Sequence, residues 1–241
     1  MSGERGDPGF LHDLGASLRP WRSQPLLPVS SLIVLGLPVL LSPWPLLAWL
    51  VIGLFVIGVG WCGVEREWYL RAFQGQRMDL EEAFRLSLSF FWPFARLGLL
   101  VSVALVPVFG VALVFVLREQ RVAAWTALVV GGVILDVVLT FVTPALAYDT
   151  PRALVALRAG TRMIFDQWPA SAPYALVPGI ALVLVSGVAL RWVLGAAAGV
   201  VGAVLSTLVA LALKGAIARF YLRRHPVWAA PRRETGRRLS R

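Results

Sequence analysis

The stretch from Val122 to Tyr148 constrains the fold of this chain more than any other part of the sequence. It carries a single charged residue, Asp136. It is also longer than the ~20 predominantly apolar residues that a helix needs to cross the hydrocarbon core of a bilayer. The stretch therefore predicts a membrane-spanning helix. The Arg-rich segment that follows, residues 149–168, predicts a helix on the membrane surface.

The composition places the whole chain in the same class. Of its 241 residues, 58% are hydrophobic and only 15% are charged, and the mean hydropathy is +0.75. Soluble domains do not tolerate this imbalance, so we expect an all-α, polytopic helical membrane protein. The single cysteine, Cys62, excludes an intramolecular disulfide framework and a Cys-based metal site.

Apolar runs divide the chain into a polar N-terminal segment (1–24), a transmembrane domain (25–213) and a basic tail (214–241). About six spans are expected in the transmembrane domain, at residues 26–41, 45–63, 97–117, 122–148, 171–190 and 193–213. The turn composition of residues 42–45 favours a hairpin of two spans at the start, although a single Pro-kinked helix fits as well. Residues 1–24 hold either a short interfacial helix or a disordered tail.

Two amphipathic interfacial helices are predicted, at residues 79–92 and 150–168. Asp79 can cap the first helix with Glu82 three residues later, and Leu80, Phe84, Leu88 and Phe91 share one of its faces. In the second, Thr150 is expected as the cap, with Pro151 at the first helical position. Each helix ends at a Trp-Pro pair that is expected to lead into a span. These two passages also resemble each other, so they either form an internal repeat or match only through common apolar residues.

The net charge of +10 is interpreted by position, because cytoplasmic loops of membrane proteins collect Arg and Lys. With six spans, only Arg118, Arg121 and Arg191 among the basic residues fall on the external side. Both termini and both surface helices are therefore expected in the cytoplasm of a bacterial inner membrane. We therefore expect the basic residues to orient the chain in the membrane and to contact anionic lipid. Nucleic acid is not expected as a partner.

Asp136 is the sharpest candidate for a site, because an ionised carboxylate at a span centre costs roughly 2.5 to 3.5 kcal/mol on insertion scales. Thr140 and Thr143 lie at helical spacing from it. The three residues form either a proton or cation site in a transport path, or a protonated or hydrogen-bonded Asp that joins helices. The latter is favoured, since the sequence offers no second intramembrane charge, and Lys214 and Arg191 lie near span ends.

Helix packing and surface contact account for the other candidates. Gly195, Gly199 and Gly202 allow close approach of another helix, either within the chain or in self-association. Contact with lipid headgroups or with a membrane-protein partner is expected from arginines of the second surface helix and of the tail: Arg152, Arg158, Arg162, Arg223, Arg224, Arg232 and Arg233.

Catalytic motifs are missing from the sequence. The two histidines, His12 and His225, lie in the tails, so no HExxH motif, intramembrane catalytic triad or His metal site can be built. Carboxylates such as Glu65 and Glu67 have Arg neighbours on segments expected to return to water, where solvation explains them. We therefore expect a protein that is not an enzyme, with no cofactor and no metal.

The order of its segments resembles a known family. A hairpin is followed by Gly75-Gln76-Arg77 and the helix that begins at Asp79, and later by an exit at residues 144–149 into residues 153–158. This order resembles bacterial six-span proteins similar to the membrane domain attached to some glycerophosphodiester phosphodiesterases, over residues 21–213. The resemblance implies a membrane module without chemistry of its own. Since no soluble catalytic domain is present, phosphodiester hydrolysis is not expected.

The sequence thus favours a non-catalytic accessory or scaffold protein that contacts lipid or a membrane partner. The second hypothesis is a small transporter or channel that uses the intramembrane Asp136.

Overall fold

The computed structural model describes residues 9–41, 46, 48–186 and 198–224, which form helices and turns without a strand. This confirms the all-α class. Four helices in this part of the chain are long and apolar enough to cross a membrane, as expected of a membrane protein. They are α5 (Ala48–Phe73), α6 (Leu80–Leu117), the stretch Arg121–Tyr148, and Val201–Arg224 within α12 (Ala198–Arg224).

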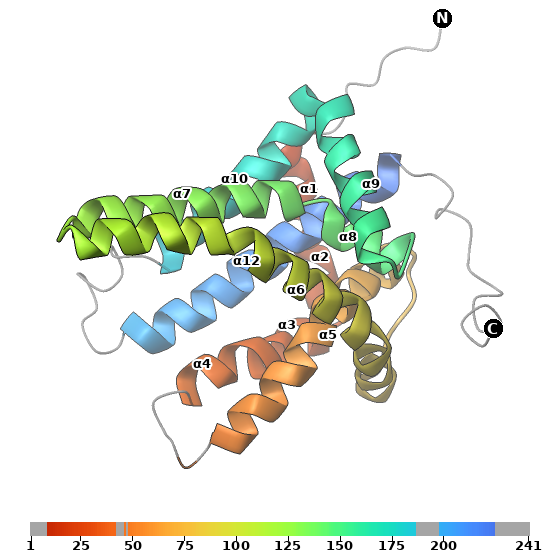
Figure 1. Cartoon of the computed structure of the whole chain (residues 1–241). Coiled ribbons are helices and arrows are strands. Elements are labelled where there is room, and N and C mark those ends of the chain that lie inside the picture. The colour runs from red at the N-terminus through yellow and green to blue at the C-terminus, as the bar shows by residue number, and fades with distance from the viewer. Residues whose placement is uncertain (1–8, 42–45, 47, 187–197, 225–241) are drawn as a thin grey trace, which may run out of the picture.

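The first predicted span consists of three short pieces. These are α3 (Leu26–Ser31), the π-helix η1 (Leu32–Gly36) and α4 (Leu37–Leu41). Both η1 and α4 contact α5, so the chain reverses direction between α4 and α5 (Figure 1). Two antiparallel segments are therefore present rather than a single kinked helix. Two helices precede them, α1 (Phe10–Ser17) and α2 (Arg19–Ser23).

The second predicted span extends further than expected. Helix α5 continues ten residues beyond Gly63 to Phe73, and the turns around Glu65 are buried, so the prediction that the chain returns to water there was wrong. Glycines explain the burial. A Cβ atom at Gly60 would overlap the backbone of Ser87 on α6, and one at Gly63 would lie 2.5 Å from the Phe90 ring. Their absent side chains let α6 cover this end of α5.

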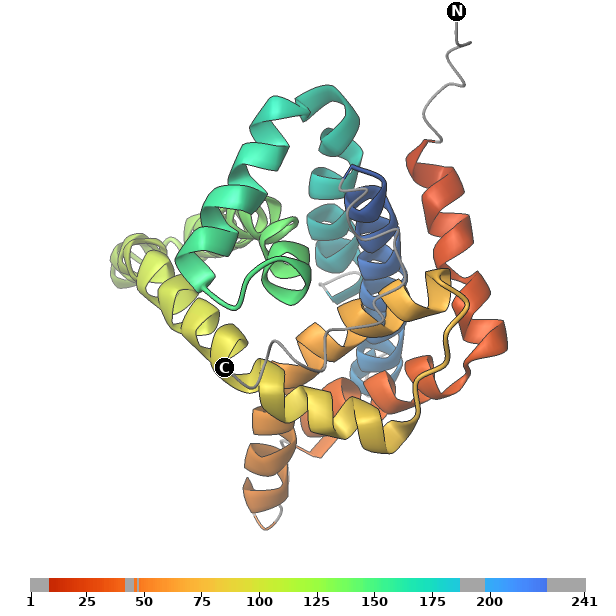
Figure 2. The same cartoon turned by 90° about the vertical axis from the view of Figure 1, so that its right-hand side faces the viewer.

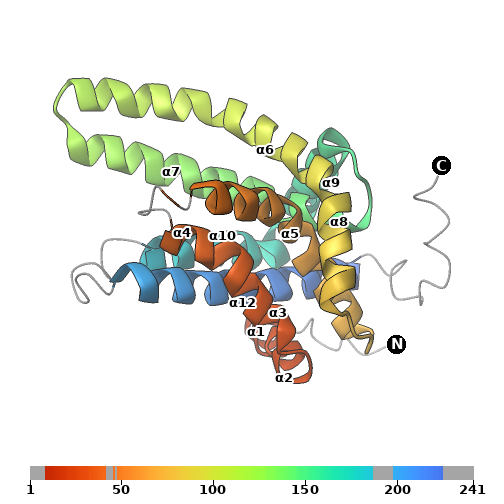
Figure 3. The ribbon, with the colours of Figure 1, turned by 90° about the horizontal axis from the view of Figure 1, so that it is seen from below.

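Helix α6 unites two elements that were predicted separately. The first surface helix and the third span are one helix from Leu80 to Leu117, with Pro93 and Pro107 inside it. A proline removes one backbone hydrogen bond, which bends a long helix more readily than it ends one when both sides are packed. Figure 3 shows the bend between the first part of α6 and its long second part. The predicted cap is present, since Asp79 accepts a hydrogen bond from the Glu82 amide at 2.7 Å.

The fourth predicted span is broken rather than continuous. Helix α7 (Arg121–Leu139) ends two residues before α8 (Val142–Tyr148) begins. Helix α9 (Ala153–Asp166) crosses at this break, because a Cβ atom at Gly160 would lie 2.5 Å from the Val142 amide nitrogen. The N-cap of α9 is Arg152, so the predicted start at Thr150 and Pro151 was two residues too early.

The last described helices are α10 (Trp168–Ser186) and α12. Helix α12 continues beyond the predicted span end at Leu213 as far as Arg224, so the first part of the predicted tail is helical. Three of its basic residues there, Lys214, Arg219 and Arg223, bind carboxylates of other helices. Residues 187–197 and 225–241, which include Gly195, Arg232 and Arg233, lie outside the described residues.

The core occupies one end of the molecule. There α1, α2, α8, α9 and the ends of α5 and α12 enclose Trp68, Tyr69, Phe141 and Phe220 (Figures 1 and 2). The α6–α7 hairpin extends away from this end, and only 6% of the most apolar part of each of its helices is buried. The outer ends of the hairpins therefore expose apolar side chains, as lipid contact requires.

Candidate functional site

Three consecutive charged residues of α5 lie inside the protein. Glu65, Arg66 and Glu67 are 0%, 4% and 7% exposed. The adjoining Trp68 and Tyr69 are fully buried as well, so these turns of α5 belong to the core. A buried charge is costly unless it is paired and hydrogen-bonded, and each of these residues has such contacts.

Glu65 and Arg66 join α5 to two other helices. The Lys214 ammonium on α12 lies 2.6 Å from Glu65 Oε2. The Arg66 guanidinium donates to the Lys214 carbonyl oxygen at 2.8 Å and to Thr143 Oγ1 on α8 at 2.9 Å. We call Glu65, Arg66, Thr143 and Lys214 the buried charge cluster. Because removal of one partner from a buried ion pair costs about 3–5 kcal/mol, this cluster fixes α5, α8 and α12 relative to one another.

Neutral hydrogen bonds surround the buried charge cluster. Tyr148 donates to the Arg66 carbonyl oxygen at 2.7 Å, and Tyr69 donates to the Leu211 carbonyl oxygen at 2.9 Å. The Trp21 indole on α2 donates in turn to the Tyr69 hydroxyl at 2.8 Å. The N-terminal helices therefore cover the cluster through hydrogen bonds as well as by packing.

A second ionic contact fixes helix α1. Asp13 on α1 is fully buried, and Arg223 on α12 donates to both of its carboxylate oxygens at 2.6 Å. Tyr174 on α10 donates to the same carboxylate at 2.5 Å, and Arg219 lies 3.4 Å from it. We call this set, together with the neighbouring His12, the Asp13 clamp. It binds α1 along the last turns of α12 (Figure 2).

The predicted polar stripe of the fourth span is divided between different contacts. Thr140 donates to the backbone carbonyl oxygen of Asp136, and Thr143 accepts from Arg66. The Asp136 carboxylate faces α10, where a Cβ atom at Gly179 would lie 3.3 Å from Oδ2. Within the described residues, Oδ2 is buried and makes no hydrogen bond. Neither threonine hydroxyl therefore bonds to the Asp136 carboxylate.

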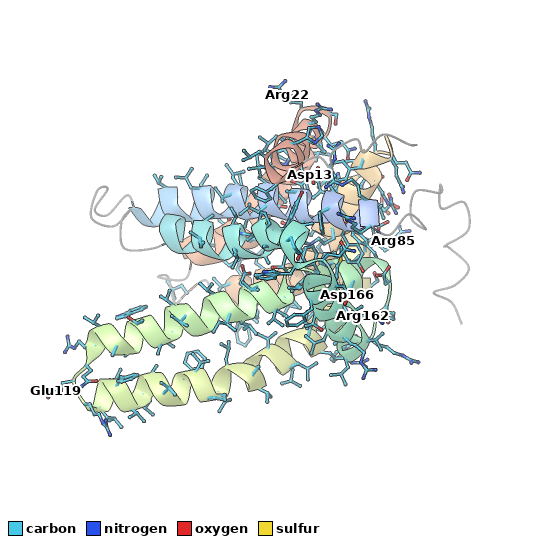
Figure 4. The ribbon with its side chains drawn as sticks, turned by 90° about the horizontal axis from the view of Figure 1, so that it is seen from above. Asp13, Arg22, Arg85, Glu119, Arg162 and Asp166 are labelled. Atoms are coloured by element: carbon cyan, nitrogen blue, oxygen red, sulfur yellow. The ribbon has the colours of Figure 1, made fainter. Side chains whose placement is uncertain are left out.

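The predicted headgroup-contacting arginines fall into two groups. Arg152, Arg158 and Arg162 are exposed on or beside α9, and Arg162 pairs with Asp166 at 3.1 Å. Arg223 belongs to the Asp13 clamp, and Arg224 lies with its guanidinium 5.5 Å from the Phe220 ring centre. Arg152, Arg158, Arg162 and Arg224 are therefore exposed, whereas Arg223 is held by the buried Asp13. Figure 4 places Arg85, Arg162 and Asp166 at one end of the molecule and Glu119 at the other.

Thr143 and Arg223 were predicted as site residues, but for other roles; the remaining residues of the buried charge cluster and of the Asp13 clamp were not predicted as sites. Glu65 was assigned to water, and Lys214 was set aside because it lies at a span end. Two signals were present in the sequence. Lys214 is the only lysine of a chain that otherwise uses arginine, and Glu65-Arg66-Glu67 directly precedes the aromatic pair Trp68-Tyr69. What the sequence could not give was the pairing across 149 positions between Glu65 and Lys214.

The described residues contain no group of three or more His, Cys, Asp or Glu side chains that could hold a metal ion. No protein-family model matches the chain, and no curated protein and no solved structure matches it either. The resemblance to the membrane domain of glycerophosphodiester phosphodiesterases therefore stays a prediction.

Proposed function

We propose that this chain is a non-catalytic accessory protein of the bacterial inner membrane that holds two surface helices against the cytoplasmic leaflet. In this proposal the chain spans the membrane six times with both termini in the cytoplasm. The surface helices are the first part of α6, residues 80–92, and α9. Their ligand is the anionic lipid surface.

The observation that carries the proposal is the division of residues 80–92 into three faces. One face packs on α5 through Ala83, Ser87 and Phe90. A second face exposes large apolar side chains at intervals of four residues: Leu80 (46%), Phe84 (48%), Leu88 (61%) and Trp92 (66%). The third face is polar and exposed, with Glu81, Arg85 and Ser89.

A helix with these three faces fits a membrane surface beside a protein. Beyond the exposed Arg96, α6 again exposes apolar side chains, including Leu99 and Val103 of its membrane-length part. The polar face lies next to the stripe rather than around it, which is the arrangement of an interfacial helix. Trp92 lies where the two parts of α6 meet, and tryptophan is enriched at that depth.

Helix α9 has a similar arrangement. Its buried face includes Ala156, Gly160 and Ile164. Leu154 and Phe165 are 67% and 79% exposed, with Arg158 and Arg162 beside them. Long arginine side chains can extend from an apolar surface to phosphate groups, so α9 can bind headgroups while its apolar residues enter the interface.

The test compares two adjacent positions of the first surface helix. Cys62→Ser removes the single native thiol, and Leu88→Cys or Ser89→Cys then introduces a spin label into the full-length chain. The proteins are placed in vesicles of phosphatidylethanolamine and phosphatidylglycerol. Collision with oxygen, which concentrates in lipid, is compared with collision with a water-soluble nickel chelate. We expect the label at residue 88 to collide mainly with oxygen and the label at residue 89 mainly with nickel.

Nickel access at both positions would contradict lipid contact by this helix. If the label at residue 88 were instead shielded from both reagents, the stripe would be covered by a protein, and the partner would be a membrane protein rather than lipid. A label at Val103→Cys, in the membrane-length part of α6, calibrates the lipid signal in the same vesicles.

A further inference from the structure

Asp136 lies inside the membrane in the proposed topology. It follows Arg121, the first residue of α7, by 15 positions, which corresponds to about 22 Å along a helix. The hydrocarbon core is ~30 Å thick. The carboxylate therefore lies within the apolar layer, on the side of the bundle where α8, α9 and the buried charge cluster gather.

Near Asp136 lie buried polar atoms without hydrogen bonds, together with positive and negative charges that sum to zero. Among the described residues, Asp136 Oδ2, Glu65 Oε1 and Arg66 Nε are buried and make no hydrogen bond. Arg66 on α5 and Lys214 on α12 are the charged groups that act electrostatically on the Asp136 carboxylate. With both carboxylates ionised, these four residues carry no net charge, and uptake of one proton leaves a single positive charge.

The other elements beside α7 leave this side of Asp136 uncharged. Described residues 168–186 of α10 contain no ionisable side chain except Tyr174, which belongs to the Asp13 clamp. The charged residues of α9, Arg158, Arg162 and Asp166, are exposed, as is Arg96 on α6. Thr143 and Tyr148 of α8 are both bonded to Arg66. Arg66 and the Glu65–Lys214 pair therefore set the charge that Asp136 experiences.

The break in the helix gives this site the architecture of a polar membrane centre. Helix α7 ends three residues after Asp136, and Thr143 beyond the break holds Arg66. Interrupted helices at membrane depth are tolerated where the backbone is buried in protein or lines a water-filled cavity. They form the ion and substrate sites of many transporters.

We infer that Asp136 binds and releases a proton inside the membrane, with the positive charges of Arg66 and Lys214 stabilising its ionised form. A proton from water joins a carboxylate oxygen of Asp136 to give the neutral acid, and the reverse step returns it to water. No other bond is made or broken. This activity goes beyond lipid contact by the surface helices, and it is the chemistry that a small proton-linked transporter or channel would use.

The test is labelling with dicyclohexylcarbodiimide, an apolar reagent that reacts with protonated carboxyl groups in membranes. The full-length protein in phosphatidylethanolamine and phosphatidylglycerol vesicles is treated over a series of pH values, and the modified residue is found by peptide mass spectrometry. We expect labelling at Asp136 that is lost as the pH of the medium rises. Asp136→Asn removes this labelled peptide and serves as the identity control.

A second variant tests the role of the neighbouring charges. Glu65→Gln together with Lys214→Gln removes both charges of the pair and leaves side chains that can hydrogen-bond to each other, so no single charge remains buried without a partner. The variant loses an attractive charge, Lys214, and a repulsive one, Glu65, and of the two Lys214 is the one that acts on Asp136, so the stabilisation of ionised Asp136 weakens. Labelling of Asp136 in this variant should therefore persist to higher pH than in the wild type.

Two results would overturn the inference. If Asp136 remained unlabelled at every pH at which the protein is folded, it would not take up a proton. If it were labelled equally at every pH, it would be a permanently neutral residue that joins helices. Either result would leave the spin-label test of the surface helices unaffected, so the two proposals can fail separately.

Discussion

At the scale of single residues, the Asp13 clamp gives a prediction about stability. Asp13→Asn keeps the size of the side chain but removes the charge that binds Arg223 through two hydrogen bonds of 2.6 Å. Arg223 remains partly accessible to solvent, with 25% of its side chain exposed. The cost should therefore lie near the lower end of the roughly 3–5 kcal/mol seen when a buried pair loses one partner. Thermal unfolding in detergent, with amide exchange along α1, measures it.

The matched control is Asp166→Asn, which removes an exposed ion pair with Arg162 on α9. Exposed pairs contribute about 0–1 kcal/mol, so this variant should unfold close to the wild type. Equal unfolding of the two variants, with unchanged exchange in α1, would show that the Asp13 clamp does not hold the N-terminal helix.

Glycine positions give a second prediction at this scale. Gly60→Ala would place a methyl group against the backbone of Ser87, which cannot move aside as a side chain could. Overpacking typically costs 1–3 kcal/mol, about the range expected here. Gly53→Ala on the same helix meets nothing within 4 Å, and it should change stability by at most ~1 kcal/mol. Thermal unfolding of both variants in the same detergent measures their stabilities. Similar losses of stability in the two variants would contradict the close approach of α5 and α6.

At the scale of elements, the sequence predicted which helices are present better than where each helix begins and ends. Hydrophobic length predicted α5, α6, α7 and α12, and the capping motif predicted the start of α6 at Asp79. The ends of α5 and α12 were missed because charged residues were taken to mark the water surface. Glu65 and Lys214 pair with each other inside the protein instead, and only the fold brings them together.

The break between α7 and α8 has one cause in the local sequence and one in the fold. Pro144 has no backbone N–H for the Thr140 carbonyl and its ring clashes with that carbonyl, so the sequence disfavours a straight helix here. Helix α9 also crosses at the break, with Gly160 against the backbone of Phe141 and Val142. A tertiary contact of this kind leaves no periodic signal in the sequence.

Helix α9 carries the prediction that belongs to this scale. Replacement of Arg152, Arg158 and Arg162 by Gln should reduce the amount of phosphatidylglycerol that co-purifies with the protein from mixed-lipid vesicles. Each basic residue held at an anionic surface contributes up to about 1 kcal/mol, and Arg162 should contribute least because it also pairs with Asp166. Lipid mass spectrometry after gentle solubilisation measures the ratio of phosphatidylglycerol to phosphatidylethanolamine.

Arg118→Gln with Arg121→Gln is the control for this experiment. Both residues are exposed at the tip of the α6–α7 hairpin, at the other end of the molecule from α9. If phosphatidylglycerol decreased equally in both variants, the effect would reflect total charge rather than the position of α9.

At the scale of the whole molecule, the segregation of charge defines two ends. The buried charge cluster, the Asp13 clamp and the arginines of α9 gather at the end with the surface helices. The tip of the α6–α7 hairpin, where Figure 4 labels Glu119, also carries Arg118 and Arg121. Because positive residues accumulate on the cytoplasmic side, the clustered end should face the cytoplasm. The hairpin tip should then face the periplasm.

Single cysteines test this orientation in intact bacterial cells. In the Cys62→Ser background, Glu119→Cys should react with a thiol reagent that cannot cross the inner membrane, because Glu119 is exposed at the hairpin tip. Arg85→Cys, which is exposed at the other end, should react only after the membrane is opened. The mass that the thiol reagent adds to each protein shows whether its cysteine has reacted. If Arg85→Cys reacted in intact cells and Glu119→Cys did not, the molecule would have the opposite orientation. The surface helices would then lie on the periplasmic leaflet, which contradicts the lipid-contact proposal.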